Sequence, residues 1–62
     1  MQHIENLMCT HYASLSEKDM RHYAAVEAAK LGHGGINYIA DLFRCCRQTV
    51  SAGIEELKKM KF

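Results

Sequence analysis

Two short apolar patterns, separated by three residues, constrain what this sequence can fold into more than any other feature. Within 36–43, apolar residues recur at the three- and four-residue spacing of a helix face, and the same spacing returns within 47–57. Helices joined so closely must cross steeply, which requires a small residue where they approach and apolar residues at the joint. Ala40 is the small residue, and Phe43 and Cys45 occupy the joint. The spacing therefore predicts a helix-turn-helix.

An amphipathic helix is predicted upstream, over residues 2–13. Ile4, Leu7, Met8 and Leu15 are spaced so that they share one helical face. A domain of this length buries only about 60% of the surface that its unfolded chain exposes, so it gains stability from association. We therefore expect a weak or stable homodimer with Ile4, Leu7 or Met8 near its interface.

A second helix is predicted to begin after Ser16, a favourable N-cap, with the acidic Asp19 three positions later. Gly32 provides a left-handed stop. The residues expected on its apolar face are Met20, Tyr23, Ala24, Val26, Ala28 and Leu31. Glu27 lies beside this face, so we expect it to be partly buried and bonded to a backbone N–H or to Tyr12.

Together these segments predict an all-α fold, a small bundle of three to four helices that contains the helix-turn-helix. The chain has no proline and many strong helix formers, which favours helix over sheet. One domain is expected over 1–62, with an N-terminal amphipathic helix in 1–15 and a trihelical unit in 16–62. The residues expected in one core are Ile39, Ala40, Phe43, Val50, Ile54 and Leu57.

Charge is distributed unevenly along the chain. Residues 1–42 carry three basic and five acidic side chains, whereas residues 43–62 carry five basic and two acidic ones. This bias favours an anionic partner for the second half. In a helix-turn-helix that binds DNA, the second helix enters the major groove, where Arg47 can bond guanine and Gln48 adenine bidentately. The outward face of that helix is expected to carry Cys46, Arg47, Gln48, Ser51, Ala52 and Glu55, and the residues that can reach phosphates are Arg44, Thr49, Lys58 and Lys59. All of these except Cys46 are predicted contacts to double-stranded DNA.

A series of short motifs between Leu15 and Leu57 also indicates DNA binding. They are Leu15-Ser16-Glu17-Lys18, Arg21, Tyr23-Ala24-Ala25, Glu27-Ala28, Leu31-Gly32, Gly34-Gly35-Ile36, Thr49-Val50, Gly53-Ile54 and Glu56-Leu57. In these motifs the chain resembles the N-terminal region of a family of bacterial insertion-sequence transposases of the DDE type. It departs from that pattern at Arg44 and Cys46, where we expect Gly and Ser. The residue after Phe43 usually adopts the left-handed conformation, which favours glycine, and Cys46 is a weak cap for the helix that follows.

The resemblance implies a domain that binds terminal inverted repeats in the bacterial cytoplasm. In such transposases an RNase H-like catalytic domain with three metal-binding carboxylates follows, and 62 residues cannot include it. We therefore expect no enzyme activity. Two alternatives remain, a helical dimerisation or protein-interaction domain that does not bind DNA and a free-standing DNA-binding regulator.

Other chemistries have weaker support. The four histidines and three cysteines form no Cys-x-x-Cys or His-x-x-x-His pair, so neither a metal site nor a cofactor is expected, and the cysteines are interpreted as reduced thiols. A Cys–His nucleophile needs an orienting group and a pocket, and a small-molecule substrate also needs a pocket, which so small a domain hardly offers. The glycines of 32–35 lack the Lys and Ser/Thr of a P-loop and predict a tight helix connection. There is neither a membrane-spanning apolar run nor a signal peptide.

Overall fold

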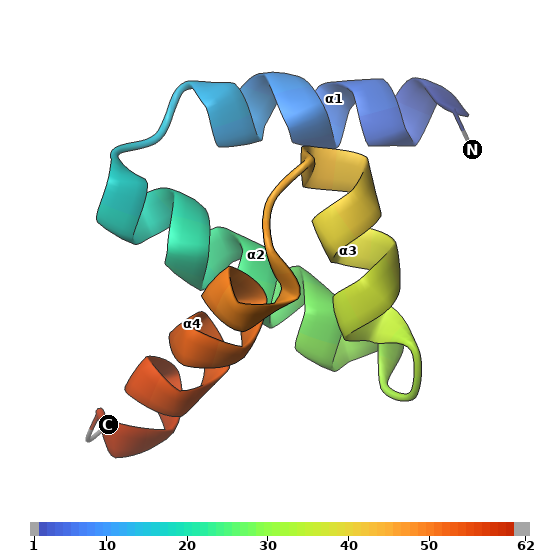
Figure 1. The fold of residues 1–62 in the computed structure, drawn as a ribbon. Coiled ribbons are helices and arrows are strands. Elements are labelled where there is room, and N and C mark those ends of the chain that lie inside the picture. Colours follow the sequence, from blue (N-terminus) through green and yellow to red (C-terminus); the bar gives the residue numbers. More distant parts are fainter. Residues whose placement is uncertain (1, 61–62) are drawn as a thin grey trace.

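The computed structural model describes residues 2–60, which form four helices and no strand (Figure 1). They are α1 (Gln2–Ala13), α2 (Glu17–Leu31), α3 (Gly35–Phe43) and α4 (Arg47–Lys59). The all-α prediction is confirmed, and the predicted bounds agree except that α3 begins one residue early. The predicted C-terminal tail extends beyond Lys59, the last residue of α4, and its residues 61–62 lie outside the described part.

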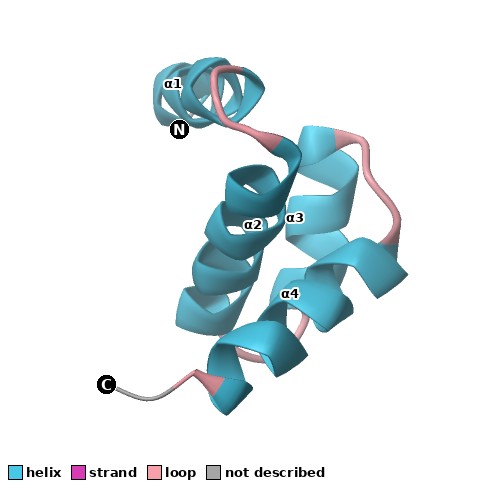
Figure 2. Ribbon diagram, turned by 90° about the vertical axis from the view of Figure 1, so that its left-hand side faces the viewer, coloured by secondary structure: helices cyan, strands magenta, loops and turns pink. Residues whose placement is uncertain are grey.

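The helices α2, α3 and α4 form a trihelical unit, and α1 lies across one end of it (Figures 1 and 2). α2 packs against both α3 and α4. In Figure 2, α2 and α3 run side by side while α4 crosses them. Within residues 2–60 no helix is both long and apolar enough to cross a membrane.

Local capping explains where α2 begins and ends. The hydroxyl of Ser16 accepts a hydrogen bond from the backbone N–H of Asp19 at 3.3 Å, as the N-cap prediction requires. At the other end, Gly32 has the predicted positive φ of 72°, but its ψ of −134° lies outside the left-handed helical region. A side chain would be strained in this conformation, so glycine is required there. The N–H of Gly35 then donates to the Gly32 carbonyl at 2.9 Å and closes the tight connection to α3.

The core lies where α2, α3 and α4 meet. The residues of its buried cluster are Ala24, Ala28, Ile39, Ala40, Phe43 and Val50. Four of the six predicted core residues are therefore confirmed. Ile54 is half-buried and packs against the cluster. Leu57 was wrongly placed in the core, because it lies at the open edge between α2 and α4, where it lines a surface groove with Val26.

One side of α1 packs against the core, and the predicted apolar stripe is only partly covered. α1 contacts the core through Met8, Cys9 and Tyr12, whereas Ile4 and Leu7 remain 50% and 56% exposed. The ring of Tyr12 stacks on Phe43 with a centroid distance of 4.2 Å. This aromatic contact joins the Met8–Tyr12 side of α1 to the core and leaves Ile4 and Leu7 at the surface.

The apolar face of α2 is narrower than predicted. Ala24, Ala25 and Ala28 are buried, but Val26 and Leu31 are 47% and 54% exposed. α2 turns its small side chains toward α3 and α4, since alanine permits the helices to approach closely, and this orientation leaves the larger residues at the periphery. Glu27 is partly buried as predicted, with 19% of its side chain exposed, but it pairs with Lys30 at 3.4 Å and not with Tyr12.

Candidate functional site

The turn between α3 and α4 has the geometry that the sequence predicts. Arg44 adopts the left-handed conformation, with φ 56° and ψ 45°, directly after the last residue of α3. The N–H of Cys45 donates to the Ala40 carbonyl at 3.0 Å, which closes the end of α3. Cys46 is the N-cap of α4 and makes no capping hydrogen bond through its side chain, as expected of a weak cap. Three residues thus connect two helices that share one core.

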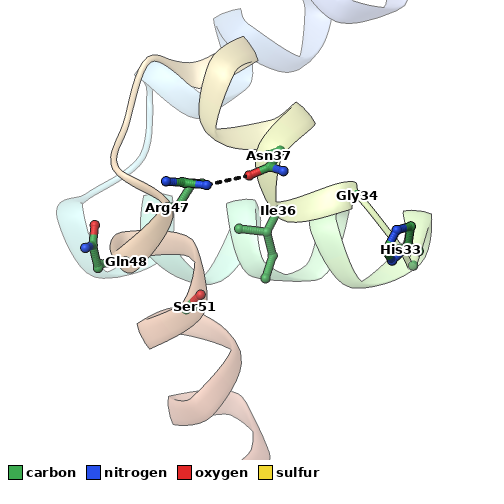
Figure 3. A pocket seen from close by; sticks show the side chains of 8 residues that line it. His33, Gly34, Ile36, Asn37, Arg47, Gln48 and Ser51 are labelled. Atoms are coloured by element: carbon green, nitrogen blue, oxygen red, sulfur yellow. Dashed lines mark hydrogen bonds between the residues drawn. The ribbon is translucent and has the colours of Figure 1, made fainter.

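An open hollow lies where the first turn of α4 meets the first turn of α3. Its volume is about 580 Å³. The residues that line it are Gly32, His33, Gly34, Ile36, Asn37, Arg47, Gln48 and Ser51. Figure 3 shows the side chains of Arg47, Gln48 and Ser51 along the start of α4, opposite Asn37 and Ile36 of α3. Three of the nine predicted contact residues are therefore brought together at one surface feature.

The side chain of Arg47 crosses this hollow. Its Nη1 donates to the side-chain oxygen of Asn37 at 3.3 Å (Figure 3). Within residues 2–60 no carboxylate forms an ion pair with Arg47 or Arg44, and both residues are exposed. The positive charge at the start of α4 is consequently not neutralised by a neighbouring side chain.

The other predicted residues of α4 are distributed along the helix. Ala52, Glu55 and Lys59 are exposed, and at about 100° per residue they share the outward face with Gln48. Lys58 is also exposed, but it pairs with Glu55 at 3.5 Å, which partly cancels its charge.

Thr49 does not belong to this face. It is half-buried on the opposite flank of α4 and lines a separate hollow with Glu17, Met20 and Arg21 of α2. Its position within the helix carries it toward α2 and away from Gln48, and its role as a phosphate contact stays a prediction.

A cluster of charged and polar groups fixes α4 to α2. The Nε of Arg21 donates to both carboxylate oxygens of Glu56, at 3.0 and 3.1 Å, and the Nε2 of His22 lies 2.8 Å from one of them. The hydrogen bond from Arg21, and secondly that from His22, lowers the pKa of the Glu56 carboxyl below its usual range. The second half of α4 is therefore tied to α2, while Arg47 and Gln48 at its start remain exposed.

Sequence reasoning missed Asn37 and the cluster around Glu56. The sequence around Glu56 gives no indication of this cluster, because the partners of Glu56 lie 34 and 35 residues away along the chain. Asn37 offered a weak signal, since it is a polar residue in the first turn of a strongly apolar helix.

Within residues 2–60 no three His, Cys, Asp or Glu side chains come together in a way that could hold a metal ion. Comparison of the chain with family models, curated proteins and solved structures finds no match.

Proposed function

We propose that this chain is a DNA-binding helix-turn-helix module, the end-recognition domain of a transposase or a truncated remnant of one. The observation that carries the proposal is the position of Arg47, Gln48 and Ser51 at the exposed start of the second helix of the pair. These side chains offer the donors and acceptors that bond base edges in the major groove. The resemblance to insertion-sequence transposases supports the same function and suggests the bacterial cytoplasm as its location.

The electrostatics of α4 support a modest and salt-dependent affinity. Arg44, Arg47 and Lys59 are exposed cations, and residues 2–60 contain no ion-pair partner for them. Each phosphate that such a cation neutralises releases condensed counterions, so binding weakens as salt rises. The formal net charge of only +1 limits this general attraction, and specificity then depends on the few side chains at the start of α4.

The test compares Arg47→Ala with Lys59→Ala on a pool of duplexes that carry a randomised central segment. The bound fraction is sequenced, and affinities are then measured at several salt concentrations. Arg47→Ala should weaken the selected duplex by about 1–3 kcal/mol and relax the preference at one base pair. Lys59→Ala should weaken all duplexes about equally and flatten the salt slope by about one unit. Lys59 is preferred to Lys58 as the control because Lys58 is paired with Glu55.

A dimerisation or protein-interaction module is the second candidate, and one observation favours it. Ile4 and Leu7 on α1 are at least half exposed, and association through that helix would cover these two side chains. If neither variant changes binding to any duplex while both remain folded, α4 is not a DNA-contacting helix and this second function is preferred. Sedimentation equilibrium of the wild type and of Leu7→Ser then tests it, since loss of self-association in the variant is expected.

A further inference from the structure

The contact between Asn37 and Arg47 joins the first turns of α3 and α4 across the open hollow (Figure 3). The acceptor is a neutral amide oxygen, so the contact restricts the guanidinium without neutralising it. A carboxylate in the same place would have formed an ion pair and reduced the attraction of Arg47 for an anion.

The geometry also leaves most of the guanidinium available. Arginine has five N–H donors, and the contact with Asn37 uses one of them, on Nη1. The edge formed by Nε and Nη2 keeps all its hydrogens, and this edge is one of the two that can bond a planar acceptor pair bidentately. Arg47 is an exposed residue, and within residues 2–60 its side chain has no hydrogen bond besides that to Asn37.

We propose that Asn37 is a positioning residue that orients Arg47 for bidentate contact with a guanine in the major groove, and so sets base preference without contacting the base itself. The proposal rests on the proposed function in DNA binding. A long arginine side chain loses rotamer freedom when it binds, and a contact that restricts it beforehand reduces that loss. Asn37 thereby strengthens discrimination at the one base pair that Arg47 contacts.

The experiment uses the full chain and the pool of randomised duplexes, with variants at Asn37 and Arg47. Arg47→Ala should relax the preference at one base pair, and Asn37→Ala should reduce the preference at the same base pair by about three- to tenfold. A modest coupling energy between contacting residues produces a fold-change of this size. Asn37→Asp keeps the acceptor, so the preference should persist while its added negative charge weakens all duplexes alike. In an Arg47→Ala background, Asn37→Ala should have no further effect. Asn6→Ala on the exposed surface of α1 is the matched control and should change nothing.

A second measurement does not depend on DNA. In the unbound protein, the order parameter of the Arg47 Nε–H group should fall in Asn37→Ala and remain near the wild-type value in Asn37→Asp. Both positions are exposed, and circular dichroism should confirm that the helices are retained.

The outcomes separate this proposal from the one on which it rests. If Arg47→Ala relaxes a base preference but Asn37→Ala does not, the positioning role is wrong and the DNA-binding function stands. An effect of Asn37→Ala that persists in the Arg47→Ala background also overturns the role, because Asn37 would then contact DNA independently. If the wild type enriches no duplex, both proposals fail together.

Discussion

Gly53 provides the sharpest test of how α4 packs, because the fold and helix propensity predict opposite effects of its replacement. Gly53 is buried in the middle of α4, where it faces α2. A Cβ atom at this position would lie 2.5 Å from the carbonyl oxygen of Arg21 and 3.0 Å from the Cβ of Ala25. Since the nearest obstacle is backbone, Gly53→Ala forces the two helices apart.

The magnitude follows from two opposing terms. Alanine in place of glycine within a helix contributes about 1 kcal/mol of stability through propensity. Overpacking costs about 1–3 kcal/mol, and the upper part of that range applies when backbone must move. The net expectation is a loss of about 1–2 kcal/mol in the free energy of unfolding. For a domain of this size that corresponds to a fall of about 5–15 °C in Tm.

The assay is urea denaturation followed by far-UV circular dichroism, with a thermal melt as a second measurement. Ala52→Gly, at the neighbouring exposed position of α4, is the control and should lose about 1 kcal/mol through propensity alone. Both variants should therefore be less stable than the wild type. A rise in stability for Gly53→Ala would refute the close approach of α2 and α4 and leave propensity as the governing effect.

Three further predictions concern the turn before α4, the N-cap of α2 and the carboxylate that ties α4 to α2. Arg44→Gly should raise the free energy of unfolding by about 0.5–1 kcal/mol in urea denaturation, because glycine adopts the left-handed conformation without the steric cost that an arginine bears. Unchanged or lower stability of Arg44→Gly would contradict the steric cost assigned to Arg44. Ser16→Ala should lower the free energy of unfolding by about 1 kcal/mol through loss of the N-cap bond, whereas Ser16→Asp should retain most of it. Equal losses in the two variants would argue against capping. The lowered pKa of Glu56 stabilises the fold above the pKa that this carboxyl has in the unfolded chain, and the contribution is lost as pH falls through the folded value. Thermal melts at a series of pH values should show Tm falling through this acidic range, and Glu56→Gln should flatten that dependence. The same slope in the variant would rule out Glu56 as its source.

The spacing of apolar residues was sufficient to predict four helices in the right places, and the reason is that helix limits depend on residues close together in the chain. Ser16 caps α2 through the third residue after it, and Gly32 ends that helix by its own backbone conformation. Arg44 was expected to be left-handed and is so, because the turn that follows Phe43 demands it locally. The exposure of Gln48 was predictable for the same reason, since it lies about 200° around the helix from the buried Val50.

The tertiary structure decided which sides of the helices are buried and which side chains meet. Periodicity shows that a helix is amphipathic, but the rotation of its buried face depends on what it packs against. Tyr12, which stacks on Phe43, lies on the packed side of α1, while Ile4 and Leu7 remain exposed, and the close packing of the alanines of α2 leaves Leu31 at the surface. The contact of Asn37 with Arg47, the role of Gly53 beside Arg21 and the ties of Glu56 to α2 all join residues at least ten positions apart, and such contacts exist only once three helices are packed together.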